Sequence, residues 1–394
     1  MFSIKIKRMI TLLIVLAALV LAGIVGIFFG YNYVISQTKN YAKLETEIED
    51  GSLYINADTE GAVMIVVDSG DDSSAIAKKL KDLGLIDNTM IFSLMSKFNG
   101  FDGGYLAGTH FLVQDLTYDE MMYLLCQPPE VVTVTIPEGM TYIQVKAALH
   151  EAGLSFDDED LDAVMNSPNL FVDYDFVSQI VAEDGRDFIL SGYLFPDTYE
   201  FDINASPEEI VSTFLRNMDS KLYDEYYTRA AKLGMTLDQV FTLASLIQSE
   251  TTDVSDMLFI SAVFHNRLNS GDPSLEALSS CASINYLREQ AGLDRVWAAS
   301  SSDMLWDSPY NTYLNTGLPP GPICMPGEDA IQAALYPEPN CNYLYFCATG
   351  IDGGTAFAVT AAEQQQNVEK YSANWTDTPV SETADTTDTT DAEQ

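Results

Sequence analysis

The chain has 394 residues, of which 47% are hydrophobic and 11% aromatic, enough for two or three folded domains with cores of their own. It carries 58 acidic and 19 basic residues, a formal net charge of −39 at pH 7. Because no basic surface is available to neutralise phosphates, this composition argues against a nucleic-acid partner. Such an acidic excess commonly serves solubility, so it identifies no positively charged partner either.

The cysteine pattern argues against a metal site. None of the five cysteines forms a CxxC pair or lies beside a histidine at zinc-ligand spacing. Cys341 and Cys347 flank a predicted strand, which separates their Cα atoms by roughly 20 Å, beyond disulfide reach. Any disulfide would therefore join distant segments, and the odd number leaves at least one thiol.

The N-terminal segment has the pattern of a membrane anchor. Lys5, Lys7 and Arg8 precede 9–29, a run without charges, and the next charge is Lys39. About 20 apolar residues span a bilayer core, and a basic flank keeps its side cytoplasmic. The run exceeds a signal-peptide core and no convincing cleavage site follows, although a cleaved signal is the alternative. We therefore expect a retained anchor, with the rest of the chain outside the cytoplasm.

A small unit is predicted after an acidic, polar segment at 39–58. Apolar periodicity, capping residues and glycine turns give the order strand, helix, helix, strand, helix, at residues 62–70, 74–84, 88–95, 103–113 and 116–126. No cluster of catalytic side chains is present there. Such units outside a membrane typically bind a ligand or act as spacers.

The next segment combines strands, helices and aromatic residues. A strand at 131–139 leads into a helix at 141–153, and 206–227 has the pattern of one long amphipathic helix. In 190–202, aromatic residues alternate with proline and aspartate. Aromatic faces stack on sugar rings, so this segment predicts the wall of a groove, and a turn packed by aromatics is the alternative.

The stretch 236–251 is organised around one acidic residue. Thr236 and Gln239 form a predicted capping box, and apolar residues follow at helical spacing. Glu250 lies four residues after Leu246 and three after Ile247, which places it on the apolar face. Burial disfavours the charged form of a carboxyl, so Glu250 has the position of a general acid. The alternative is a helix-end glutamate turned toward solvent.

A helix at 255–271 and a constrained loop follow. His265 in this helix is most simply structural, and the three histidines form no Ser–His–acid arrangement. The segment 308–335 is rich in proline and glycine, which fixes an ordered loop before a helix. Residues 310–313, Tyr-Asn-Thr-Tyr, offer hydroxyls, an amide and aromatic faces, with a rigid structural crossover as the alternative. The tail from 376 is rich in Thr and Asp and is predicted to be disordered.

Several of these motifs, in this order, resemble those of the YceG-like family of endolytic murein transglycosylases. The resemblance covers about residues 61–372 and the N-terminal anchor. It is carried by IPEGMTYIQV (136–145), GYLFPDTYEF (192–201), LASLIQSET (243–251), FHNRL (264–268), YNTY with TGLPPGPI (310–323), and the Pro-Gly pair at 326–327.

The resemblance implies an α+β protein with an anchor, a small LysM-like module and a larger mixed α/β catalytic domain. The implied boundaries are a cytoplasmic N-terminus at 1–8, a transmembrane helix at 9–30, a linker at 31–60, the LysM-like module at 61–128, the catalytic domain at 129–372 and a disordered acidic tail at 373–394. It further implies cleavage of the MurNAc-β-1,4-GlcNAc bond within peptidoglycan strands and partnership with cell-wall synthases. Neither a cofactor nor a metal is expected.

The resemblance assigns the catalytic acid to Glu250. A glycosidase that uses water needs two carboxyl groups, whereas a lytic transglycosylase lets the MurNAc 6-hydroxyl attack its own anomeric carbon and leaves a 1,6-anhydro end. One carboxyl then acts first as acid and then as base. We expect Ser249, Asn311 and Tyr313 to position the sugar, from the loop chemistry and their proximity to Glu250.

The sequence also departs from the family pattern. Neutral or smaller residues replace expected acidic, Asp-Pro-Thr and histidine positions, at Gln248, Ser191, Cys281-Ala282-Ser283, Thr355 and Gln364. These replacements keep open a second hypothesis, a weakly active or non-catalytic protein that binds the cell wall. A third hypothesis, a soluble hydrolase, needs a second carboxylate near Glu250, for which Asp253 and Asp256 are the nearest in sequence.

Overall fold

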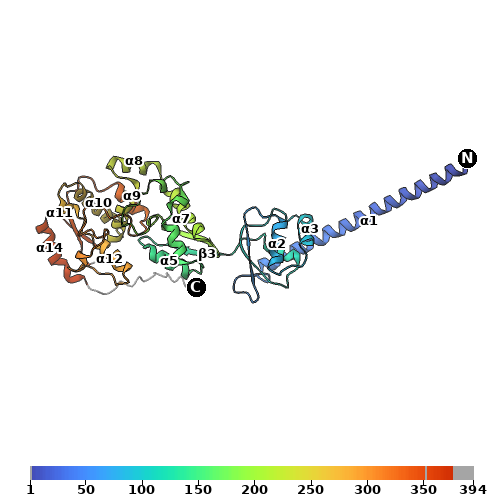
Figure 1. Cartoon of the computed structure of the whole chain (residues 1–394), viewed down its shortest axis with the longest axis horizontal. Coiled ribbons are helices and arrows are strands. Elements are labelled where there is room, and N and C mark those ends of the chain that lie inside the picture. The colour runs from blue at the N-terminus through green and yellow to red at the C-terminus, as the bar shows by residue number, and fades with distance from the viewer. Residues whose placement is uncertain (1, 351–352, 376–394) are drawn as a thin grey trace, which may run out of the picture. The chain divides into compact units, whose positions relative to one another are not determined.

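The computed structural model describes residues 2–350 and 353–375 and divides the chain into two compact units, residues 1–131 and 132–394. Figure 1 shows helices in both units, with short strands between them. In the described residues the strands form three two-stranded sheets, β1–β2, β3–β4 and β5–β6. This mixture of separate small sheets and helices confirms the predicted α+β class.

The first unit begins with one long helix, α1 (Phe2–Glu49). The linker predicted at 31–60 is therefore helical up to Glu49, because its residues include good helix formers and Lys43 pairs with Glu47 one turn on, at 2.8 Å. Among the described residues, no helix combines the length and the apolar character needed to cross a bilayer. The transmembrane helix predicted at 9–30 is not confirmed.

The remainder of the first unit has the predicted order of elements. These are β1 (Val63–Val67), α2 (Ser73–Asp82), α3 (Thr89–Asn99), β2 (Gly108–Leu112) and α4 (Tyr118–Leu124). β1 and β2 pair antiparallel, with Ile65 opposite His110. Apolar side chains of all five elements form the core, among them Ile65, Ile76, Leu80, Phe92, Leu112 and Met121. The element order agrees with the prediction, while a LysM-like fold is not confirmed.

The second unit contains most of the helices. They are α5 (Tyr142–Glu151), α6 (Asp158–Met165), α7 (Pro207–Lys221), α8 (Asp224–Leu233), α9 (Leu237–Glu250), α10 (Val254–Leu268), α11 (Pro273–Glu276), α12 (Cys281–Gln290), α13 (Glu328–Leu335) and α14 (Ala361–Tyr371). The strands are β3 (Val131–Thr135), β4 (Thr198–Asp202), β5 (Tyr345–Ala348) and β6 (Thr355–Ala358). Short 3-10 helices lie at Pro168–Phe171, Val177–Gln179, Asp303–Leu305 and Ser372–Asn374.

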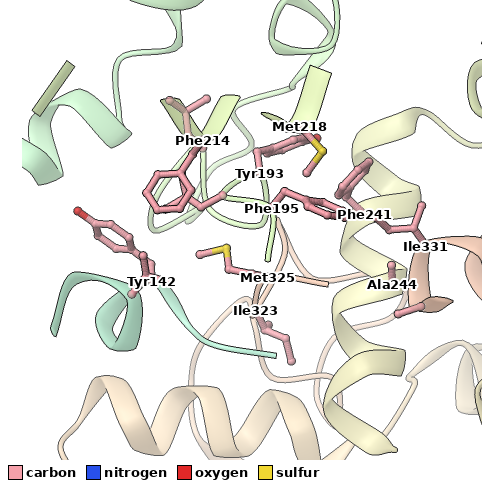
Figure 2. Packing of buried hydrophobic residues seen from close by; sticks show 14 of the residues in the cluster. Tyr142, Tyr193, Phe195, Phe214, Met218, Phe241, Ala244, Ile323, Met325 and Ile331 are labelled. Atoms are coloured by element: carbon pink, nitrogen blue, oxygen red, sulfur yellow. The ribbon is translucent and has the colours of Figure 1, made fainter. Parts of the chain in front are cut away.

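Helix α9 lies at the centre of the second unit. Its predicted capping box is confirmed, since the Thr236 amide donates to Gln239 Oε1 at 2.9 Å and the Gln239 amide donates to Thr236 Oγ1 at 3.1 Å. Every side chain from Val240 to Gln248 is buried, and α9 packs against α8, α10, α12 and α13. Figure 2 shows Phe241 and Ala244 of α9 beside Ile331 of α13. This packing fixes the direction of the helix end that carries Glu250.

The loop before α13 runs along α9. The Ile323 amide donates to Ser245 Oγ at 3.0 Å, and the Gly327 amide donates to Gln248 Oε1 at 2.9 Å. Ile323 and Met325 also belong to the hydrophobic core, as Figure 2 shows. The proline-rich segment is thus an ordered part of the core.

The aromatic segment 190–202 is not the wall of a groove, so that prediction is wrong. Tyr193, Phe195, Tyr199 and Phe201 are each at most 6% exposed. Tyr193 stacks on Phe241 of α9, with 4.9 Å between ring centroids. These rings pack in the hydrophobic core, which agrees with the alternative interpretation of the segment as a turn packed by aromatic residues.

Two further predictions are changed by the structure or lie outside it. The single helix predicted at 206–227 is two helices, because Leu222 and Tyr223 are extended and α8 restarts with Asp224 and Glu225 in its first turn, where acidic side chains favour a helix N-terminus. The predicted disordered tail lies, from residue 376 onward, outside the described residues. All five cysteines are free thiols.

Candidate active site

Glu250 is the last residue of α9, and its carboxyl points to the start of α12. The side chain is partly buried. Ser280, the N-cap residue of α12, donates its hydroxyl to Glu250 Oε1, and the Ala282 amide donates to the same carboxyl. Glu250 is therefore enclosed by protein groups, and the alternative of a solvent-directed glutamate is wrong.

Two opposed effects set the proton affinity of Glu250. Burial raises its pKa above the ordinary glutamate value, because the charged form loses its hydration. The Ser280 hydroxyl, the Ala282 amide and the positive charge of Arg295 act in the other direction, since each stabilises the carboxylate. The free amides at the N-terminus of α12 add to this stabilisation. Burial prevails, so the carboxyl keeps its proton to a higher pH while the donors for its anion are already in place.

The turn that carries Ser280 is held by Thr312. The Ser280 amide donates to Thr312 Oγ1 at 3.0 Å, and the Ser279 amide donates to the Thr312 carbonyl at 2.9 Å. Ser283 Oγ lies 2.9 Å from Thr312 Oγ1. Thr312 belongs to the Tyr-Asn-Thr-Tyr motif, so this motif positions the donor that contacts Glu250.

Tyr313 lies close enough to Glu250 for the charge of Glu250 to influence it. Its hydroxyl is 3.3 Å from the Cys281 thiol, at the first residue of α12. Burial and then the charge of Glu250 raise the pKa of Cys281. The pKa of Tyr313 is raised by burial first and also by Cys281 and Glu250. Both groups therefore remain protonated near neutral pH and offer a neutral hydroxyl and thiol next to the carboxyl.

Asn311 and Ser249 use their polar atoms inside the protein. Asn311 is completely buried, and its amide nitrogen donates to the carbonyls of Trp306 at 2.8 Å and Met304 at 3.2 Å. The Ser249 hydroxyl donates to the Ser245 carbonyl at 2.8 Å, with Cys324 Sγ at 3.3 Å. In this structure Asn311 shapes the loop and Ser249 joins the loop to α9, rather than facing an open site.

The carboxylates considered for a hydrolase belong to a helix start. Asp253 is the N-cap of α10 and accepts hydrogen bonds from the amides of Ser255 and Asp256. The same Asp253 oxygen also accepts the Ser255 hydroxyl. Asp253 is thus used as a helix cap, and Asp256 lies in the first turn of α10.

The residues that differ from the family pattern have structural partners here. The Gln248 side chain accepts from Gly327, as described above, and Gln364 Nε2 donates to the Phe346 carbonyl at 2.8 Å. Gln364 Oε1 is buried without a partner.

His265 Nε2 lies 2.9 Å from the Ala334 carbonyl, and burial lowers the pKa of this histidine. A neutral, structural His265 agrees with the simpler of the two sequence interpretations.

One cavity lies at the other end of α9, beside the first residues of the helix. It has a volume of about 270 Å³ and is lined by Thr242, His265 and Pro320, among others, but not by Glu250. In the part of the chain that the structure describes, no group of His, Cys, Asp or Glu is arranged to hold a metal ion.

Sequence reasoning missed Ser280 and Thr312, which are the residues that complete the site. Ser280 is recognisable only as an N-cap before a helix, a signal that many serines share. Its partner Glu250 is 30 residues away in the sequence. The sequence marks Thr312 as one of the four residues of the Tyr-Asn-Thr-Tyr motif, but it does not indicate the hydrogen bond between Thr312 and Ser280.

Comparisons with known proteins show which proteins this chain resembles. The model of the YceG-like family matches residues 65–370. An endolytic murein transglycosylase of Bacillus subtilis is 31% identical over 325 residues, which cover 80% of this chain and 87% of that protein. An endolytic murein transglycosylase of Streptococcus pneumoniae is 29% identical over 386 residues; the match covers 93% of this chain and 65% of the pneumococcal protein.

A solved structure extends the similarity to the fold. The crystal structure of a YceG-like protein from Listeria monocytogenes has a TM-score of 0.53 and 28% sequence identity to this chain. The alignment covers 77% of this chain and 98% of the Listeria chain.

Proposed function

The chain belongs to the YceG-like family, and we propose that it is a lytic transglycosylase of peptidoglycan. It cleaves the MurNAc-β-1,4-GlcNAc bond within glycan strands and leaves a 1,6-anhydroMurNAc end. The observation that carries this proposal is one partly buried carboxyl, that of Glu250, whose pKa is raised by burial. The Ser280 hydroxyl and the Ala282 amide already donate hydrogen bonds to this carboxyl and stabilise its anion. The murein activity named for the Bacillus and pneumococcal relatives supports the substrate class.

In the first step Glu250 acts as a general acid. Its proton passes to the glycosidic oxygen as the bond to the anomeric carbon breaks, and positive charge develops on the sugar. The carboxylate formed is stabilised by the Ser280 hydroxyl, the Ala282 amide and the N-terminus of α12. These groups are fixed before the reaction, so no reorganisation is needed when the charge appears.

In the second step the same carboxylate acts as a base. It removes the proton of the MurNAc 6-hydroxyl while that oxygen bonds to the anomeric carbon of the same sugar, which restores the protonated Glu250. Because the attack is intramolecular, it avoids the entropy cost of bringing in a separate nucleophile. One carboxyl thus serves both steps, consistent with Asp253 being occupied as a helix cap.

Tyr313 is the sugar-contacting residue that the geometry supports best among those predicted. It lies next to Cys281 and feels the charge of Glu250. A tyrosine here offers a ring face to a sugar and a hydroxyl to its polar groups. Asn311 and Ser249 then act indirectly, through the shape of the loop and its attachment to α9.

The proposed location of the enzyme is the outer face of the cell membrane. The uncharged run at 9–29 with its basic N-terminal flank supports a single-pass anchor with a cytoplasmic N-terminus. The module at 61–128 would then contact the wall, and cleavage of new strands would limit their length beside the synthases. The competing function is binding of glycan strands without cleavage. The departures from the family pattern at Gln248 and Cys281 favour it.

Product mass tests the proposal directly. Purified peptide-free glycan strands incubated with the enzyme are expected to yield shorter strands with anhydroMurNAc ends, detected by mass spectrometry. Hydrolysis would instead add the mass of one water to each pair of products. Reducing ends without anhydro products would contradict the transglycosylase reaction, and unchanged strands would support the binding function.

The pH dependence tests the role of Ser280. Because Glu250 must be protonated in the first step, kcat/KM is expected to fall as the pH rises through the raised pKa of Glu250. Ser280→Ala removes a donor that stabilises the anion, so the pKa of Glu250 rises further and the alkaline limb of the profile moves to higher pH. Ser274→Ala, which removes a hydroxyl that donates to the N-cap residue Asp272 of α11, is the matched control. A limb that stays in place in Ser280→Ala would remove Ser280 from the tuning of Glu250.

A further inference from the structure

The last turn of α9, which ends at Glu250, also holds a second carboxyl group, that of Glu138, through the side chain of Gln248. Gln248 lies two residues before Glu250 and projects to the turn that contains Glu138. Its Oε1 accepts the Gly327 amide at 2.9 Å, and the Gln248 side chain also hydrogen-bonds to the Glu138 carboxyl. The last turn of α9 thus connects to two carboxyl groups, one its own and one from the turn before α5.

The backbone around Glu138 is fixed from both sides. The Gly139 amide donates to the Met325 carbonyl at 2.8 Å, and the Met325 amide donates to the Met140 carbonyl at 2.8 Å. Gly139 has a φ of +82°, a conformation that suits glycine, and a Cβ there would lie 3.6 Å from Gln248 Cγ. This reciprocal pairing ties the Pro-Glu-Gly turn to the loop that also borders α9.

The carboxyl of Glu138 occupies the space that a side chain at position 327 would take. A Cβ built on Gly327 would lie 2.0 Å from Glu138 Oε1 and 2.5 Å from Oε2. Gly327 is the N-cap of α13 and has a φ of −78°, which any residue can adopt. The glycine at 327 is therefore explained by room for the Glu138 carboxyl rather than by backbone conformation.

The Glu138 carboxyl lacks a cationic partner within the described part of the chain. The influences on it are burial and the charge of Asp329, which both raise its pKa, and the Gln248 hydrogen bond, which lowers it. The residue remains exposed to solvent. An acceptor that is fixed in place, accessible and not neutralised is suited to the hydroxyl and acetamido N–H donors of a glycan.

We infer that Glu138 is a second substrate-contacting carboxylate, which positions a sugar next to the bond that Glu250 cleaves. The inference depends on the proposed transglycosylase function and extends it. Glu138 transfers no proton in this role, so the one-carboxyl mechanism is unchanged. Gln248 is the positioning residue that aligns Glu138 with the α9 end, and Gly327 leaves the space for it.

Substitution of Glu138 by Gln tests the inference in the full-length protein. A hydrogen bond to a charged group contributes about 1.5–3 kcal/mol, which corresponds to a rise in KM of about 10-fold to 150-fold on peptide-free glycan strands. We expect kcat to change far less than KM, because the lost contact is present in both the bound and the transition state. The substitution keeps the size of the side chain and a hydrogen-bonding partner for Gln248.

Gly327→Ala provides an independent test, because it displaces the Glu138 carboxyl without removing it. It should raise KM as Glu138→Gln does, and the double variant should show little additional rise, since both changes remove one contact. Glu328→Gln, which removes a charge from the same end of α13, is the control and should leave KM unchanged.

The outcomes separate the possible roles. If Glu138→Gln lowers the melting temperature but leaves KM unchanged, the carboxyl only stabilises the start of α13 and the inference is wrong. If the effects of Gly327→Ala and Glu138→Gln on KM are additive, the two substitutions act on different contacts. The inference that Gly327 acts by leaving space for the Glu138 carboxyl is then wrong. Failure of the wild-type protein to form anhydro ends would count against the proposed function, whereas an unchanged KM in an active Glu138→Gln variant counts against this inference alone.

Discussion

Replacement of Glu250 by Gln is expected to lower kcat on glycan strands by about 10²-fold to 10⁴-fold, the usual contribution of a general acid. The amide has nearly the shape of the acid and can still contact Ser280, but it cannot give a proton to the glycosidic oxygen or accept one from the 6-hydroxyl. The loss should therefore appear in kcat, with binding of the strand largely kept. Anhydro products counted by mass spectrometry under single-turnover conditions measure this step.

A matched control distinguishes the loss of the acid from general damage. Glu208→Gln makes the same change on the exposed side of α7 and should retain full activity. Thermal melting of Glu250→Gln should remain close to that of the wild type. If the variant still forms anhydro ends at the wild-type rate, another group supplies the proton and the assignment of Glu250 has to be abandoned.

The position of Glu250 was predictable because local rules determine it. The capping box at Thr236 sets the start of α9, and helical periodicity then places Glu250 on the apolar side at the end. Burial of a carboxyl follows from that placement, as does the direction of its pKa. A single helix with a clear start signal and a regular apolar face therefore carried the central prediction.

The partners of Glu250 were not predictable from local rules. Contact between Ser280 and Glu250 depends on how α12 docks, and that docking depends on Thr312 in a loop without regular structure. Polar residue type alone also misled at Asn311, because an amide suits a sugar and a loop carbonyl equally well. Only the folded loop decides which of the two it contacts.

The aromatic segment shows a related limit. A pattern of aromatic residues with proline and aspartate is compatible with a sugar-binding wall and with a core, since both bury ring faces. Burial of Tyr193 against Phe241 decides for the core. Gly192 within this segment has a φ of +89°, and a Cβ there would lie 2.4 Å from Pro322 Cβ. The segment therefore packs against the proline-rich loop within the core and does not form a sugar-binding surface.

The same region contains a buried ion pair that no sequence signal indicated. Arg186 donates to both carboxylate oxygens of Asp238, at 2.7 and 3.0 Å, and the Tyr193 hydroxyl donates to Asp238 Oδ1 at 2.7 Å. The Arg186 side chain is 1% exposed and that of Asp238 is 10% exposed. Arg186 also reaches the Pro320 carbonyl, at 3.4 Å, so the pair connects the start of α9 to the proline-rich loop.

Substitution of Asp238 by Asn is expected to destabilise the second unit by about 3–5 kcal/mol, because it leaves the Arg186 charge buried without a counter-charge. The melting transition of that unit, followed by calorimetry, measures the loss. Asp158→Asn is the control, since Asp158 pairs with Lys146 and His150 from a side chain that is 56% exposed, and exposed pairs contribute about 0–1 kcal/mol.

A double variant separates the two explanations for such a loss. If the cost arises from the unpaired charge, Arg186→Met combined with Asp238→Asn should recover part of the stability, because a buried pair replaced by less charged groups avoids the desolvation cost. Equal destabilisation in the single and double variants would instead mean that the contacts of Arg186 with the proline-rich loop matter more than its charge. Such a loss should also lower activity, because the loop that Arg186 supports leads to Tyr313 and Thr312 beside Glu250.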